Sequence, residues 1–129
     1  MAVPADQERV RLEAPLIAID RVIAEFALPR GIEVTKNLQD WPERSLTWGE
    51  GVRRRIQIYL QDPKAMTFNL WLCAWSDAKG SRHWKREFLV KAKPLAEFAA
   101  DLPALLAEGE AKLQGWARNP ELLEPASRR

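Results

Sequence analysis

The sequence predicts an α+β domain with an N-terminal helix, a four-stranded antiparallel β-meander and a C-terminal helix that is kinked or restarted near Pro103. Two observations indicate this class. Apolar and polar residues alternate along three consecutive stretches between Arg53 and Lys91, as they do in strands with two different faces. On either side of that region, apolar residues recur every three or four positions, which is the pattern of amphipathic helices.

The N-terminal helix is expected over residues 15–28. Pro15 is tolerated at its start, because an N–H in the first turn has no intrahelical partner to lose. Pro29 and Gly31 should end the helix. Residues 1–13 lack a sustained apolar stripe and are expected to form a flexible tail. The apolar stripe of the helix consists of Leu16, Ile19, Ile23 and Phe26.

Four strands are expected in chain order, over residues 45–48, 53–61, 67–76 and 81–91. Gly49-Glu50-Gly51 favours a hairpin loop, and Asp62-Pro63 and Asp77-Ala78-Lys79-Gly80 favour tight turns. Connections this short between consecutive strands require antiparallel pairing, because a parallel crossover needs about a dozen residues. The sequence leaves open a further short strand near Ile32 and Val34. Trp41 and Trp48 are expected to pack at the end of the core.

The C-terminal helix is expected over residues 94–116. Its apolar positions are Leu95, Phe98, Leu102, Leu105, Leu106, Leu113 and Trp116, which keep a helical period. An interior proline removes a hydrogen bond and clashes with the preceding turn, so Pro103 predicts a kink, or a restart with Asp101 as N-cap. Residues 117–129 lose the pattern and are expected to form a flexible tail, which leaves residues 14–116 as a single domain.

Alternation along the strands separates an apolar face from a basic, aromatic face. The predicted core face consists of Ile56, Ile58, Leu60, Phe68, Leu70, Leu72, Ala74, Trp84, Phe88 and Val90, with Arg86 as an exception. The opposite face is expected to carry Arg53, Arg55, Gln57, Tyr59, Asn69, Trp71, Cys73, Trp75, His83, Lys85, Glu87, Leu89 and Lys91. Two arrangements remain open. The N-terminal helix covers this second face, or both helices pack side by side on the core face and leave it uncovered.

Positive charge is concentrated in this central region. The whole chain has a net charge of +2, but residues 53–93 contain ten Lys or Arg against three acids. The local charge of +7 would attract anionic partners and make their binding depend on salt. The competing interpretation is that Lys and Arg protect sheet edges from aggregation.

The residue inventory excludes or weakens several functional classes. One cysteine allows no intramolecular disulfide, and one cysteine with one histidine cannot supply a four-ligand structural zinc site. Cys73 and His83 share a predicted face, but this nucleophilic pair has little support. No phosphate-binding glycine motif is present, so no cofactor is expected and an enzyme is the least supported class. The chain has no membrane-spanning apolar stretch or secretory signal pattern, which predicts a cytoplasmic protein without membrane contact.

The basic, aromatic face therefore carries the functional hypothesis. Aromatic rings stack on unpaired bases while cations neutralise phosphates, so this face is expected to bind single-stranded nucleic acid. The predicted binding residues are Tyr59, Trp71, Trp75, Arg53, Arg55, Lys85 and Lys91. The alternative is a protein-interaction or homodimerisation module that uses the same face, since Trp, Tyr and Arg are enriched at interface hot spots. A small-ligand or catalytic pocket is a third class.

Overall fold

A computed structural model describes residues 6–37, 42–77 and 82–125, except for the side chains of residues 6–12 and 37. Within these ranges the chain forms an α+β fold with two long helices and one six-stranded antiparallel sheet. The helices are α1 (Asp6–Ala27) and α2 (Leu95–Arg118). The strands are β1 (Glu33–Asn37), β2 (Glu43–Trp48), β3 (Arg53–Asp62), β4 (Thr67–Ser76), β5 (His83–Pro94) and β6 (Glu124–Pro125).

The α+β class and the antiparallel meander are confirmed, whereas the prediction of four strands was wrong. Strands β2 to β5 correspond to the four predicted strands, and the sheet order β1-β2-β3-β4-β5-β6 adds one strand at each edge. The hairpin between β2 and β3 turns where the glycine loop predicted it. Gly49 has a φ of 100° there, and a Cβ at this position would lie 2.8 Å from the Val52 carbonyl oxygen.

Helix α1 begins at Asp6, well before the predicted start at Pro15, so Pro15 lies inside the helix. The predicted apolar stripe is correct, because Leu16, Ile19, Ile23 and Phe26 are all buried. A short 3₁₀ turn at Leu28–Arg30 ends the helix, and Gly31 follows in the left-handed conformation with a φ of 65°.

Helix α2 runs from Leu95 to Arg118 as one helix, so the restart with Asp101 as N-cap is not observed. Pro103 is exposed within it, while Leu102 and Leu106 on the inner side are fully buried. Burial of this apolar stripe therefore outweighs the hydrogen bond lost at the proline. Asp101 instead forms an ion pair with Lys93 at 3.1 Å.

Ordered structure also continues into the predicted C-terminal tail. A 3₁₀ turn at Pro120–Leu122 follows α2, and strand β6 pairs with the start of β5 through His83 and Trp84. Leu123 lies between these two elements and is 5% exposed. This buried side chain holds the segment against the core.

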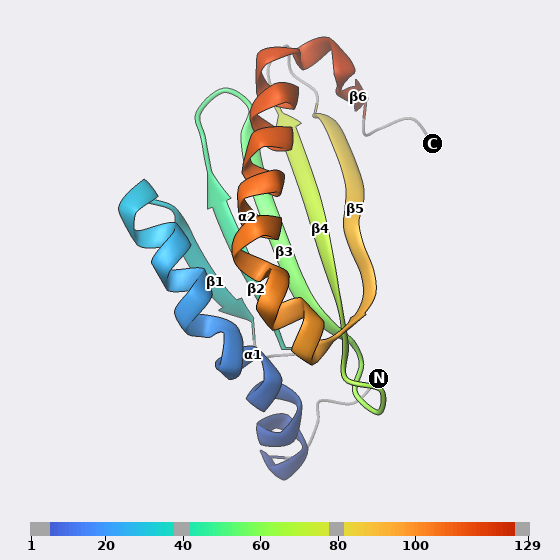
Figure 1. The fold of residues 1–129 in the computed structure, drawn as a ribbon. Helices are drawn as coiled ribbons and strands as arrows, with labels where there is room; N and C mark the ends of the chain where they lie inside the picture. The colour runs from blue at the N-terminus through green and yellow to red at the C-terminus, as the bar shows by residue number, and fades with distance from the viewer. Residues whose placement is uncertain (1–5, 38–41, 78–81, 126–129) are drawn as a thin grey trace.

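Both helices pack on the same face of the sheet, as Figure 1 shows. Helix α1 contacts β1, β2 and β3, and helix α2 contacts β3, β4 and β5. The core between the layers contains Ile56, Ile58, Leu70 and Leu72, and the Phe68 and Phe98 rings stack with their centroids 4.9 Å apart. Of the two arrangements that the sequence left open, the structure therefore has the one with both helices side by side.

Two tryptophans were predicted to close the core. Trp48 is partly buried and packs against the core, whereas Trp41 lies outside the described residues, as does most of the predicted turn after Asp77. Neither helix, within the described part of the chain, is long and apolar enough to cross a membrane.

Candidate nucleic-acid interface

The face of the sheet opposite the helices is built from alternate residues of the strands. In β3 and β4 the buried apolar residues are at even-numbered positions that face the helices, and Asn69 is the one buried odd-numbered residue of these strands. Their odd-numbered neighbours point to the other side of the sheet, because successive side chains of a strand alternate. We call this side the open face; strands β3 and β4 contribute Arg53, Arg55, Gln57, Tyr59, Asn69, Trp71, Cys73 and Trp75 to it.

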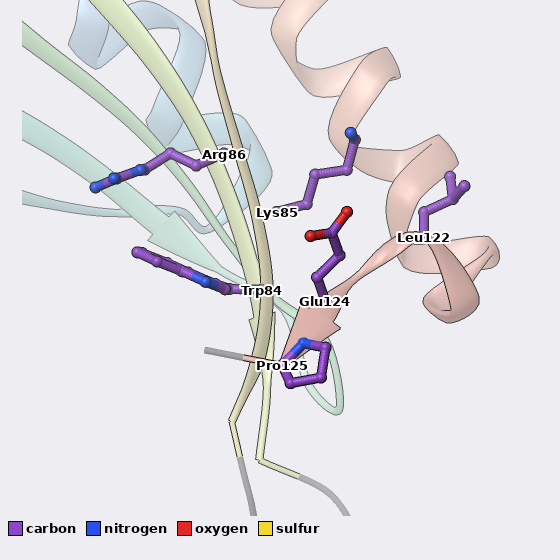
Figure 2. A pocket seen from close by; sticks show the side chains of 6 residues that line it. All are labelled: Trp84, Lys85, Arg86, Leu122, Glu124 and Pro125. Carbon is purple, nitrogen blue, oxygen red and sulfur yellow. The ribbon is translucent and has the colours of Figure 1, made fainter. Parts of the chain in front are cut away.

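From His83 to Phe88, strand β5 places the opposite set of side chains on the open face from the one predicted. Directly paired residues share a face, and the pairs are Trp75 with Trp84, Cys73 with Arg86, and Trp71 with Phe88. Trp84, Arg86 and Phe88 therefore lie on the open face, not in the core. Figure 2 shows Trp84 and Arg86 extending from one side of β5 and Lys85 from the other.

Lys85 and Glu87 lie on the helix-covered side, so the prediction that Lys85 shares a face with Tyr59, Trp71 and Trp75 was wrong. The Lys85 ammonium lies 5.1 Å from the centre of the Trp116 ring of α2. Glu87 forms an ion pair with Lys112 of the same helix. The helix side of β5 can be polar because α2 supplies partners for its charges. The prediction placed the apolar residues Trp84 and Phe88 in the core because it assumed that the helix side of β5 is apolar. The α2 partners of Lys85 and Glu87 show that this assumption was wrong.

The loop between β4 and β5 contains a signal that could have given the correct assignment. An antiparallel hairpin with an even number of loop residues pairs odd positions of one strand with even positions of the other. Six residues, 77–82, separate β4 from β5, and the four-residue turn expected from the sequence has the same parity. Either length places Trp84 and Arg86 on the face of Trp75 and Cys73.

Beyond Phe88 the register of β5 shifts twice, and Val90 returns to the core side opposite Leu70. Ala92 adopts a left-handed conformation with a φ of 52°, and its N–H donates to the side-chain oxygen of Asn69 at 2.8 Å. Such bulges redirect a strand locally. The predicted core position of Val90 is correct for this reason, although Trp84 and Phe88 are on the other face.

Three rows of residues run across β3, β4 and β5 on the open face. The pairings place Arg53, Trp75 and Trp84 in the first row, Arg55, Cys73 and Arg86 in the second, and Gln57, Trp71 and Phe88 in the third. The central row thus has a short thiol side chain between two arginines. Tryptophans stand on either side of it along β4.

Cations lie over the aromatic rings of this face. The Arg55 guanidinium carbon is 4.8 Å from the Trp75 ring centre, and that of Arg86 is 4.8 Å from Trp71 and 4.5 Å from Trp84. The Lys91 ammonium is 4.6 Å from the Phe88 ring centre. Cation–π contacts of this kind are worth about 0.5–1 kcal/mol at exposed sites, so they orient the cations without immobilising them.

Tyr59 and Trp71 are held by a local polar network. The Trp71 indole N–H and the Asn69 amide each donate to the Tyr59 hydroxyl oxygen at 3.0 Å. Phe88 packs against Trp71 with ring centroids 3.8 Å apart. These contacts give Trp71 and Tyr59 a supporting role, whereas Trp75 and Trp84 have only cations over their rings in the described part of the chain.

A hollow of about 190 Å³ lies on the open face above Cys73. Burial raises the pKa of the Cys73 thiol, and the positive charges of Arg55, Arg86 and Arg82 offset this only in part. The thiol is therefore protonated and uncharged at neutral pH. His83 pairs with Ser76 on the other parity of the strand, so the register separates the two members of the predicted Cys/His pair. The lining consists of Arg55, Gln57, Cys73, Trp75, Arg82, Trp84 and Arg86.

The open face carries both acidic and basic side chains, and the carboxylate of Glu43 accepts a hydrogen bond from Gln57 there at 3.0 Å. Within the described ranges, no carboxylate forms an ion pair with Arg53, Arg55 or Arg86. Arg82 pairs with Asp77 at 2.9 Å, and the hydrogen bond lowers the pKa of that exposed carboxyl. The face therefore presents arginine charges that a bound anion could neutralise.

Two further hollows differ in chemistry from the one above Cys73. One of about 270 Å³ lies where β5 meets β6, and both Lys85 and Glu124 line it, so its charges are mixed (Figure 2). The other, of about 450 Å³, lies between α1 and β1 and is lined mostly by apolar residues, including Ile23 and Val34. The hollow above Cys73 is thus the one with several arginines.

Comparison of the chain with protein-family models, with curated proteins and with solved structures finds no match. A function for the open face therefore has to be argued from its own residues.

Proposed function

We propose that this chain is a non-enzymatic module that binds single-stranded nucleic acid on its open face. The observation that carries the proposal is the interleaving of Trp75 and Trp84 with arginines that have no carboxylate partner in the described residues. Bases stack on aromatic rings with about 1–3 kcal/mol per base, and cations follow the phosphates. Binding of this kind tolerates many sequences.

The arrangement of cations across the face also fits a single strand. Arg53, Arg55 and Arg86 lie on strands β3 and β5, on either side of the tryptophans of β4. A strand that crosses the sheet can therefore place bases on rings and phosphates on guanidinium groups in turn. In this proposal a stacked base replaces the guanidinium group that covers a ring in the free protein, and that guanidinium group then contacts a phosphate.

The test is a titration of a fluorescently labelled, mixed-sequence single-stranded oligonucleotide, followed by anisotropy at two salt concentrations. Three phosphate contacts would give a slope of about −2 in a plot of log affinity against log salt concentration. A fourfold rise in salt should then weaken binding about twentyfold. Absence of binding at low salt would contradict the proposal. A dimer in size-exclusion chromatography would, in that case, indicate that the face is a protein interface.

Two adjacent residues of β5 supply a matched pair of variants. Arg86→Gln and Lys85→Gln each remove one positive charge, but the first acts on the open face and the second on the helix side. We expect Arg86→Gln to weaken binding and to reduce the salt slope by about 0.7. Lys85→Gln should change the affinity less than twofold. Circular dichroism of both variants checks that the fold is kept.

A further inference from the structure

The hollow above Cys73 exists because a short side chain stands among long ones. In the central row of the open face, Cys73 is paired with Arg55 on one side and with Arg86 on the other. Along β4 its same-face neighbours are Trp71 and Trp75. The thiol reaches less far from the sheet than any of these four side chains. The surface is therefore lowest at Cys73, and the walls around it carry guanidinium and indole groups.

The two flanking arginines have hydrogen-bond donors to spare. Arg55 donates its Nε–H to Thr47 Oγ1 at 3.2 Å, and the described residues provide no acceptor for its remaining N–H groups. Arg86 likewise has no hydrogen-bond acceptor there and only the rings of Trp71 and Trp84 beside it. A guanidinium presents five donors in a planar fork that matches phosphate oxygens. Both arginines can therefore bind one anion between them.

The volume of the hollow and the uncharged thiol at its floor restrict which ligand can bind there. A volume of about 190 Å³ is below the range of about 300–1,000 Å³ that is usual for drug-sized ligands. A single compact group therefore fits better than a whole small molecule. The raised pKa of Cys73 keeps the floor uncharged, so an entering anion meets no negative charge from the thiol.

We propose that the hollow above Cys73 holds one internal phosphate of the bound strand, bridged by Arg55 and Arg86. This inference rests on the proposed function and adds the position of a phosphate on the face. Arg82, whose charge Asp77 already partly neutralises, forms the outer rim and contributes less.

Filling the hollow without changing its charge gives a direct test. Cys73→Leu extends an apolar side chain into the space, whereas Cys73→Ser keeps it open. In the oligonucleotide titration we expect Cys73→Leu to bind at least about tenfold more weakly than wild type, the loss typical of a hydrogen-bonded charged contact. Its salt slope should be shallower by about 0.7, the value for one phosphate. Cys73→Ser should stay within twofold of wild type.

A chemical footprint on the wild-type protein provides a second readout. Cys73 is the chain's single cysteine, so alkylation by iodoacetamide, followed by intact mass, reports on this position alone. A saturating oligonucleotide should slow the alkylation at least about fivefold, since the phosphate would cover the thiol. This measurement decides the matter if Cys73→Leu fails to fold, and the titration decides it if the free thiol is unreactive.

The outcomes separate the two proposals. If wild type binds the oligonucleotide but Cys73→Leu binds equally well with an unchanged salt slope, the phosphate lies elsewhere and only the inference about the hollow is overturned. An alkylation rate that a saturating oligonucleotide leaves unchanged would overturn that inference in the same way. If wild type does not bind at all, the proposed function fails and the inference fails with it.

Discussion

Arg44 of β2 is a charged side chain in the core between α1 and the sheet. It is fully buried, and its guanidinium donates to both carboxylate oxygens of Asp20, at 2.7 and 3.0 Å, and to Glu13 at 3.3 Å. A buried charge is costly unless it is paired and hydrogen-bonded. The network therefore fixes the position of α1 over β2. It connects α1 with β2, which are separated in the chain by residues 28–42.

The pH dependence of stability should show the contribution of Asp20. Burial raises the pKa of this carboxyl, but the hydrogen bonds and charges of Arg44 and Lys36 together lower it more, so the net pKa lies below its ordinary value of 3.8. Ionised Asp20 then stabilises the fold at neutral pH, and this contribution is lost as the pH falls through the lowered pKa. Urea unfolding should find Asp20→Asn less stable than wild type at pH 7. The gap should narrow steadily in acid, and a gap that is constant with pH would contradict this assignment.

Trp71 and Trp75 should respond differently to truncation. Trp71 donates to Tyr59 and packs on Phe88, so Trp71→Ala should lower the free energy of unfolding by about 2 kcal/mol, less than the 3–5 kcal/mol of a fully buried aromatic residue. Trp75 has cations rather than packed rings over it, and Trp75→Ala should cost less than about 1 kcal/mol of stability. Oligonucleotide affinity should show the reverse order at the proposed face, with about a tenfold loss for Trp75→Ala. Equal stability losses would mean that both rings are structural.

Helix α2 approaches the sheet closely at Gly109. This residue is buried, and a Cβ there would lie 3.0 Å from Leu72 Cδ2 and 3.4 Å from Ile56 Cδ1. Glycine lowers helix propensity, but here it permits the helix to lie directly on β3 and β4. Gly115, six residues further on, has no heavy atom near the corresponding position.

The two glycines give opposite predictions. Gly109→Val should destabilise the protein by about 1–3 kcal/mol, because the larger side chain overpacks the interface with Leu72 and Ile56. Gly115→Ala should stabilise it by about 0.5–1 kcal/mol through helix propensity. Thermal or urea unfolding of the two variants measures both effects. A neutral Gly109→Val would show that the helix can move away from the sheet at no cost.

Elements with a complete apolar pattern were predictable from the sequence. The stripes of α1 and α2 and the alternation in β3 and β4 follow directly from burial on one side, so those faces are correct. The sequence could not decide whether β1 is a strand, because its one apolar residue, Val34, faces α1 at a partly exposed sheet edge. Strand β6 has two residues, one of them a proline, and no pattern can identify a strand this short.

The candidate face was predictable in part for the same reason. Arg53, Arg55, Tyr59, Trp71 and Trp75 lie on strands with one clearly buried side, and they are on the open face as predicted. In β5 both sides carry apolar and charged residues, so hydrophobicity alone could not assign Lys85 and Arg86. The parity of the β4–β5 loop assigns them. The α2 partners that make a polar helix side possible are contacts between segments far apart in the chain, which the sequence does not show.

At the scale of the whole molecule, the positive charge of the central strands is divided between two environments. Towards the helices, Arg54 donates to Gln114, Lys85 lies over Trp116, and Lys93 pairs with Asp101. On the open face, Arg53, Arg55 and Arg86 have no carboxylate partner in the described residues. Helix α2 thus accommodates the charges on one side of the sheet. Only the share of the charge that lies on the open face, above all Arg53, Arg55 and Arg86, is available to a partner on the other side.

The strand order has a consequence for how the chain folds during synthesis. Each strand pairs with the one made just before it, so the sheet can grow one hairpin at a time as the polypeptide leaves the ribosome. Helix α2 is made after the first five strands, and until then the apolar side of β3 to β5 lacks its cover. The nascent sheet exposes Ile56, Phe68 and Leu72 during this interval. This is the stage at which chaperones would be expected to bind the growing chain.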